Sequence, residues 1–141
     1  MKLDYDYIKQ ILQVMQQQEA HQVTNYIIMS KLDAGMKVSV SDHVSSTIDS
    51  PEQLDKFIGH IRILNDYNCI DCSTDSLGFR QMSNNNWTLA EVNYRLTAQG
   101  YEFLDILNDK TILNRIKNLS VSTAWEVGKS LLMQQLTAGA V

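Results

Sequence analysis

Two cysteines, Cys69 and Cys72, have the C-x-x-C spacing found in zinc sites and in redox-active dithiols. A zinc site would need two more ligands, but His21, His43 and His60 offer no matching paired spacing. A redox-active pair favours a helix start, whereas this stretch reads as a strand. We therefore predict two ordinary cysteines, one of them buried, with no metal and no cofactor.

Catalytic motifs are missing from the sequence as well. It contains no phosphate-cradling glycine loop, no G-x-S-x-G, no H-E-x-x-H, and no paired carboxylates that spacing would place beside a histidine. Helix ends and solvated faces explain Asp4, Asp6, Asp105 and Asp109. The sequence therefore predicts a binding protein rather than an enzyme.

Side chains that could bind double-stranded DNA fall in two segments, residues 56–65 and residues 80–95. Lysine and arginine contact phosphates, whereas asparagine can read base edges. The candidate phosphate contacts are Lys56, Arg62, Arg80 and Arg95, with His60 beside the first two, and the candidate base contacts are Asn65, Asn84, Asn85 and Asn86.

Structural roles are open for the same residues. A solvated helix face explains Lys56 and Arg62 equally well, and His60, four residues before Leu64, fits a histidine at the edge of the core. Trp87, which follows the asparagine run, could be a protein-binding hot spot or could fold back on the core.

The charge balance weighs against DNA. The chain has 12 lysines and arginines against 16 aspartates and glutamates, a net charge of −4. Between Glu52 and Asp66, three acidic residues accompany two basic ones. Because DNA-binding proteins gain non-specific affinity by neutralising phosphates, an acidic surface favours a protein partner.

The candidate residues must be positioned by helices and a β-hairpin. Apolar spacing predicts a helix over 4–18 and another that starts at Ser50-Pro51 and runs to about Asp66, with Ser50 as its cap. "NCIDCS" and "EVNYRL" predict two strands of a hairpin, whose elaborated tip is the long polar stretch between them. "VTNYIIMSKL" can form a strand or a short helix, followed by a turn at 33–35 and a strand at "MKVSVSD".

Thr97 can cap the helix that follows the second strand. Gly100 in its first turn costs about 1 kcal/mol relative to alanine, so we predict that a neighbouring element packs closely there. Two further helices are predicted over 109–119 and 122–136, with Ser122 as a cap.

The predicted order of elements is that of a winged helix. It runs helix, uncertain middle, helix, strand, polar loop, strand and helix. We predict an α+β, mainly α, fold with a winged-helix domain at 1–108 and a C-terminal helical extension at 109–141. "LTAQGYEFLDIL" resembles the stretch that leaves the wing in many such domains.

The chain also resembles a family of uncharacterised phage- and prophage-associated proteins, a domain of unknown function. The matching stretches are "MKLDYDYIKQIL", "HIRILNDYNCI" and "YRLTAQGYEFLDILNDKTILNRIK", whereas residues 20–48 depart from the shorter connection of that family. The resemblance implies the fold, and it assigns no functional residue.

Two functions follow as predictions. The first is a DNA-binding transcriptional regulator of phage or prophage type, whose residues 109–141 either form a homodimer or pack back on their own domain. The alternative is a phage-encoded interaction module that inhibits a host nucleic-acid-binding or defence complex. A folded face that gathers Lys56, Arg62, Arg80 and Arg95 would favour DNA, whereas dispersed basic residues and a continuous acidic face would favour a protein.

No apolar run approaches the roughly 20 residues of a membrane span, and the acidic N-terminus does not resemble a signal peptide. We therefore expect a cytoplasmic protein without a membrane partner.

Overall fold

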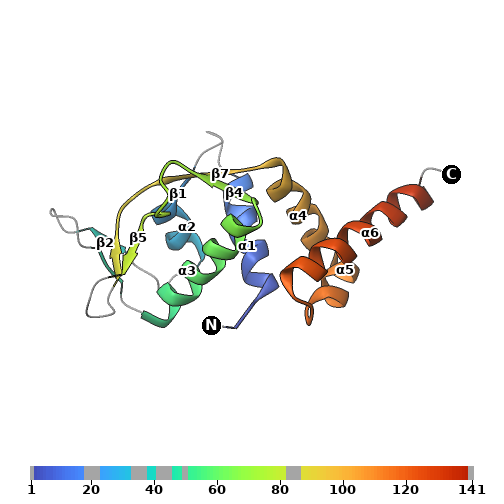
Figure 1. Ribbon diagram of the computed structural model, residues 1–141, viewed down its shortest axis with the longest axis horizontal. Helices are drawn as coiled ribbons and strands as arrows, with labels where there is room; N and C mark the ends of the chain where they lie inside the picture. The colour runs from blue at the N-terminus through green and yellow to red at the C-terminus, as the bar shows by residue number, and fades with distance from the viewer. Residues whose placement is uncertain are drawn as a thin grey trace.

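The computed structural model describes residues 2–17, 23–32, 38–40, 46–48, 51–81 and 87–139 (Figure 1). It is an α+β structure, mostly helical with small antiparallel sheets, as the sequence predicts. The helices are α1 Tyr5–Gln16, α2 Asn25–Leu32, α3 Pro51–Asp66, α4 Ala98–Asn108, α5 Lys110–Ile116 and α6 Val121–Gly139. The strands are β1 Val23–Thr24, β2 Val38–Val40, β3 Ser46–Ile48, β4 Ile70–Cys72, β5 Phe79–Gln81, β6 Trp87–Leu89 and β7 Asn93–Leu96.

The described strands form three small sheets. β7 lies between β1 and β4 and pairs antiparallel with both, while β2 pairs with β3 and β5 with β6. The predicted pairing of β4 with β7 is confirmed. The stretch between them is not simply a polar loop, because it contains β5, β6 and the buried residues Leu77, Phe79 and Leu89. These apolar side chains anchor it to the core.

The ambiguous segment after α1 contains both a strand and a helix. β1 adds a third strand to the sheet, and α2 begins directly after it. Asn25 is the residue at which the strand β1 gives way to the helix α2. Its buried side-chain amide donates a hydrogen bond to the carbonyl of Ala90 at 2.9 Å and accepts one from the N–H of Val92 at 3.0 Å. A buried amide needs such partners. The predicted turn at 33–35 and the Ser50 cap lie outside the described residues.

The core lies between the three-stranded sheet and the helices α1, α2, α3 and α4. α1 buries Ile8, Ile11, Leu12 and Met15 and packs against α2, α4 and β7. Figure 1 places α1 between the part of the molecule with α2 and α3 and the part with α4, α5 and α6. α1 therefore contacts elements of both parts.

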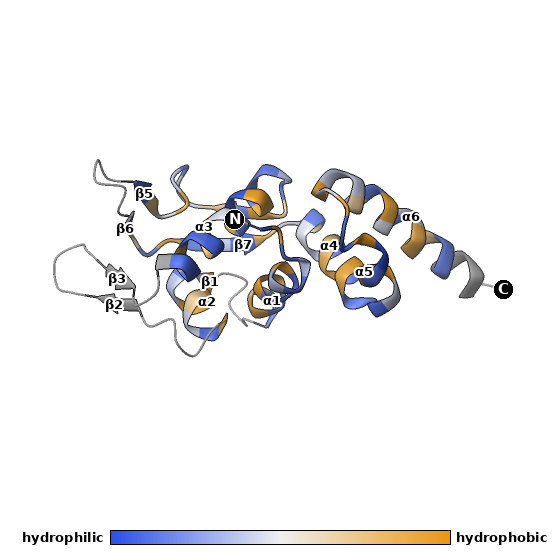
Figure 2. Ribbon diagram, turned by 90° about the horizontal axis from the view of Figure 1, so that it is seen from below, coloured by the Kyte–Doolittle hydropathy of each residue, from blue (hydrophilic) through white to orange (hydrophobic). Residues whose placement is uncertain are grey.

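α5 and α6 pack against α4 and against each other, and the predicted boundary at residues 108 and 109 falls at the α4–α5 junction. Trp125 of α6 stacks on Phe103 of α4, with ring centroids 5.1 Å apart. α6 begins at Val121, so the prediction that Ser122 caps it is wrong. Figures 1 and 2 show the C-terminal end of α6 extending away from the other helices. Among the described residues, no helix combines the length and the apolar character needed to cross a membrane.

The start of α4 confirms both predictions about "LTAQG". The Thr97 hydroxyl accepts a hydrogen bond from the Gly100 N–H at 3.1 Å, and the Thr97 N–H donates to the carbonyl oxygen of Cys69 at 3.1 Å. A Cβ atom at Gly100 would overlap that same carbonyl oxygen. Gly100 therefore lets the first turn of α4 lie directly on the backbone before β4.

Gly100→Ala is expected to lower the free energy of unfolding by about 1–3 kcal/mol, the usual cost of overpacking, although alanine is the better helix former. The Cys69 carbonyl is backbone and cannot move aside alone. Gly128→Ala is the matched control, because the nearest atoms to its Cβ belong to the side chain of Ile106, the closest at 2.5 Å, rather than to backbone. Urea unfolding should show a clearly larger loss for Gly100→Ala, and equal losses would contradict the close-approach explanation.

Candidate interaction surface

α3 presents one polar stripe to solvent. Spacings of three and four residues place its members along one side of the helix. All are exposed except Gly59, which is half-buried, while the opposite side of α3 is buried in the core. The α3 stripe consists of Glu52, Asp55, Gly59, Arg62 and Asp66.

The β5–β6 hairpin packs beside α3. Phe79 meets Phe57 of α3 edge to face, with ring centroids 5.9 Å apart, and Leu89 is buried. Phe79 pairs with Leu89 and Gln81 pairs with Trp87. Because every second residue of a strand points to the same face and directly paired residues share a face, Trp87 lies on the α3-facing side with Phe79 and Leu89.

Trp87 connects this hairpin to the α3 stripe. Its indole N–H donates to Oδ1 of Asp55 at 3.0 Å, and the guanidinium carbon of Arg62 lies 5.1 Å from the ring centroid. A guanidinium stacked on an indole is attracted to the ring and keeps N–H donors at its edge. We call Asp55, Arg62 and Trp87 the Trp87 cluster. Its indole packs against the edge of the core and stays half-buried, so it folds back on the core only in part, and its role as a protein-binding hot spot stays a prediction.

Arg80 lies on the opposite face of the same hairpin. It follows Phe79 in β5, and adjacent residues of a strand point to opposite sides. Phe79 is buried against α3, whereas Arg80 is exposed. Arg62 and Arg80 therefore do not share a face.

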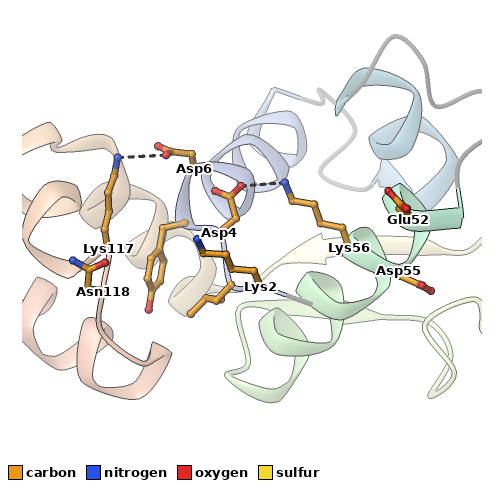
Figure 3. Close-up of a pocket in the computed structure, with 10 residues that line it drawn as sticks. Lys2, Asp4, Asp6, Glu52, Asp55, Lys56, Lys117 and Asn118 are labelled. Carbon is orange, nitrogen blue, oxygen red and sulfur yellow. Dashed lines mark hydrogen bonds and ion pairs between the residues drawn. The ribbon is translucent and has the colours of Figure 1, made fainter.

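Lys56 pairs with the N-cap residue of α1 rather than standing alone. Its Nζ lies 3.0 Å from Oδ2 of Asp4 (Figure 3). The same Nζ lies 4.5 Å from the centroid of the Tyr7 ring. Burial alone would raise the pKa of Asp4, but Lys56 and the N–H of Tyr7 outweigh it and hold that pKa below its usual value. The charge of Lys56 is thus largely balanced within the molecule.

His60 is completely buried and uses both ring nitrogens. Nδ1 lies 2.7 Å from the carbonyl oxygen of Lys56, and the backbone N–H of Asp4 donates to Nε2 at 3.0 Å. A carbonyl only accepts and an N–H only donates, so the ring is neutral with its proton on Nδ1. Burial lowers the pKa of His60. The prediction that His60 contacts DNA is therefore wrong, since its side chain has no exposed surface.

A groove of about 660 Å³ opens where the segment before α1, the start of α3 and the turn after α5 meet (Figure 3). Besides Asp4 and Lys56, it contains the pair of Lys117 and Asp6, whose Nζ and Oδ2 lie 3.5 Å apart. In all, four carboxylates and three ammonium groups line it. A groove with this balance does not favour an anion such as a phosphate.

The remaining predicted DNA contacts are dispersed. Arg95 pairs with Asp71 across β4 and β7, at 3.1 Å between Nη2 and Oδ2. Asn65 is exposed near the end of α3. Residues 84–86, the three predicted asparagine contacts, lie outside the described residues.

Both cysteines are free thiols, Cys69 buried and Cys72 half-buried, as predicted. Burial raises the pKa of Cys69 to about 12, which keeps it protonated and a poor nucleophile. Within the described ranges, no group of three histidine, cysteine or acidic side chains could hold a metal ion.

The Trp87 cluster is not predicted by the sequence pattern. Asp55 and Arg62 are seven residues apart, which places both on one side of the helix, but this spacing gives no sign of Trp87. The contact of Asp55 with Trp87 spans 32 positions of the chain, and no local pattern signals it.

No protein-family model matches the chain, and neither curated proteins nor solved structures include a significant match. The resemblance to phage- and prophage-associated proteins therefore stays a prediction.

The neutral state of His60 predicts a loss of stability in mild acid. The pKa of His60 is lower in the folded chain than the ordinary value of 6.5. Below about pH 6.5, His60 therefore binds a proton in the unfolded chain but not in the folded chain. The free energy of unfolding should be constant above this pH and fall below it by at most about 1.4 kcal/mol per pH unit. Urea unfolding between pH 7.5 and 5.5 measures this.

His60→Gln is the control, because glutamine has a donor and an acceptor but does not titrate. We expect this variant to be less stable at pH 7.5 and to lose most of the dependence between pH 7.5 and 5.5. His21 and His43 remain in it, so an unchanged pH dependence would assign the effect to them and contradict the role of His60.

Proposed function

We propose that residues 1–108 form a winged helix that recognises another protein through the α3 stripe and the Trp87 cluster. The fold proposal is supported by the order of the elements, in which β1 separates α1 from α2 and the strands β4 and β7 follow α3. A three-stranded sheet with β7 between β1 and β4 is consistent with that architecture.

The observation that carries the recognition proposal is the Trp87 cluster. Tryptophan and arginine are enriched among the residues that dominate protein–protein binding. Here Arg62 is exposed, and its guanidinium lies over an indole that Asp55 holds by a hydrogen bond. Side chains fixed before binding lose less conformational entropy when a partner arrives.

The charges around this cluster favour a protein over DNA. Glu52, Asp55 and Asp66 lie on the α3 stripe and would face phosphates if α3 entered a groove. Lys56 and Arg95 are paired with carboxylates, and Arg80 lies on the other face of the hairpin. The basic residues are therefore dispersed, and the acidic ones suit basic groups on a protein partner. Together with the predicted family, this points to the class of host nucleic-acid-binding or defence proteins.

Affinity capture from bacterial lysate with the intact chain tests this proposal. A partner should be recovered with wild type, lost with Trp87→Ala, and retained with Arg80→Ala, because only Trp87 belongs to the recognition surface. Quantitative mass spectrometry of the three captures measures this. A partner held equally by all three proteins, or recovered by none, would contradict recognition through the Trp87 cluster.

DNA-binding regulation is the second candidate, favoured by the order of α2, α3 and the following strands. Fluorescence anisotropy with a random duplex of roughly 30 base pairs tests it, at about 50 mM and then about 200 mM salt. The dispersed basic residues predict no binding up to roughly 100 μM protein, where non-specific contact would otherwise be seen. Salt-sensitive binding that weakens with Arg62→Ala and Arg80→Ala would support the regulator instead.

A further inference from the structure

His60 of α3 is covered by the short segment that precedes α1. This segment consists of Lys2, Leu3 and Asp4, and we call it the N-terminal strap. The backbone N–H of Asp4 donates to Nε2 of His60 at 3.0 Å, while Nδ1 faces the carbonyl oxygen of Lys56 within α3 itself. Since His60 has no exposed surface, the strap occupies the position from which water would otherwise reach Nε2.

A second proton on His60 cannot be accommodated while the strap is in place. It would bind to Nε2, and two N–H donors would then face each other across 3.0 Å. The imidazolium would also be buried away from water, which is costly for a charged group. Both costs disappear if the N–H of Asp4 turns away and water takes its place.

The charged groups around the imidazole act in both directions. Burial is the largest effect, and it lowers the pKa of His60. The Lys56 carbonyl and the Asp4 carboxylate oppose it, whereas the Lys56 ammonium and the amino group of the chain add to it. Tyr7 of α1 meets the imidazole edge to face, with ring centroids 5.0 Å apart, and a phenol carries no charge in acid. Burial beneath the strap therefore decides whether His60 takes up a proton.

The strap can leave α3 without unfolding α1. Lys2 is exposed, and Leu3 and Asp4 are only half-buried. Tyr5, directly after the strap, is buried, and its hydroxyl donates to the carbonyl oxygen of Leu119 at 2.7 Å. The buried face of α1 beyond it lies in the core. Tyr5 is therefore the fixed end of the strap, and local opening costs few contacts.

We propose that the N-terminal strap is a pH-sensitive element, which leaves α3 when His60 takes up a proton while α1 and the helices packed on it stay folded. The strap also forms one wall of the groove beside α3 (Figure 3). Its release widens this groove and separates the Lys56 ammonium from the Asp4 carboxylate. With the imidazolium of His60 added, the α3 side of the groove becomes more positive in acid.

The contacts of the strap set the pH at which it is released. With the strap open, His60 is hydrated and regains its ordinary pKa of 6.5. The closed strap is held by the hydrogen bond to His60, by the half-exposed ion pair with Lys56 and by the cap on the N–H of Tyr7. Each tenfold preference for the closed strap lowers the midpoint of release by one pH unit, so a preference of about tenfold to a hundredfold gives a midpoint between about pH 5.5 and 4.5.

NMR spectroscopy of the intact, isotope-labelled protein between about pH 7.5 and about pH 4 tests the proposal. The ring protons of His60 should titrate with a midpoint in the stated range, and the backbone amides of Leu3 and Asp4 should shift with the same midpoint. The heteronuclear NOE of these two amides should fall in acid, as expected for a released segment, whereas the amides of α1 from Ile8 onwards and the indole N–H of Trp125 should keep their signals.

His60→Gln removes the titrating group and retains a donor and an acceptor. In this variant the amides of Leu3 and Asp4 should no longer shift over the same pH range. The pKa of Asp4 is held below its usual value of 3.8, so its own titration falls below this range. If His60→Gln does not fold, the wild-type titration and two lysine variants still decide.

The lysine variants test whether the contacts of the strap set the midpoint. Lys56→Ala removes the ion pair with Asp4 and a positive charge beside His60, both of which favour the closed strap, so the midpoint should rise by about half a pH unit. Lys117→Ala is the matched control, because it removes the other ion pair of the groove, with Asp6. Its midpoint should stay within about 0.2 pH units of wild type.

Three results would overturn the proposal. The amides of Leu3 and Asp4 could stay unshifted down to about pH 4. They could also change only together with those of α1 and Trp125, which is global unfolding rather than release of the strap. Finally, equal midpoints for Lys56→Ala and Lys117→Ala would show that the strap does not control the protonation of His60.

Discussion

The backbone around Cys69 is the constraint on which the two ends of the molecule depend. α3 ends at Asp66, and Asn68 turns the chain with a positive φ of 58°. The carbonyl oxygen of Cys69 accepts a hydrogen bond from the N–H of Thr97, and Gly100 lies against the same carbonyl. The exit of α3, the strand β4 and the start of α4 therefore meet at one peptide. Any larger residue at Gly100 would displace α4, and with it the helices α5 and α6 that pack on α4.

Local chemistry predicted this junction, because every signal for it lies within a few residues. Thr97 is a capping residue placed before an apolar helix, and a glycine in a first turn is costly unless something packs there. The same holds for α3, whose start at Pro51 and end at Asp66 agree with the prediction. The partners of His60 and Trp87 could not be predicted, because Asp4 and Asp55 lie 56 and 32 positions away in the chain. The burial of His60 depends on the path of the segment before α1, which no periodicity encodes.

Pairing within the molecule also changes which charged residues are available to bind a partner. Read along the sequence, Lys56, Arg62 and Arg95 are three cations within reach of a nucleic acid. In the folded chain, Asp4 and Asp71 neutralise two of them, and the third is stacked on an indole. The exposed side of α3 is left with a carboxylate-rich stripe around a single guanidinium. Such a surface is selective for the geometry of its partner, because a displaced contact leaves like charges facing each other.

The position of the two tryptophans gives the molecule a built-in pair of optical probes. Trp87 lies at the surface beside a guanidinium and a carboxylate, whereas Trp125 is stacked on Phe103 between α4 and α6. No other tryptophan is present in the chain. Emission from the first reports the solvation of the recognition surface, and emission from the second reports the packing of the C-terminal helices. Each end of the protein can thus be followed in solution without a label, with one tryptophan replaced by phenylalanine at a time.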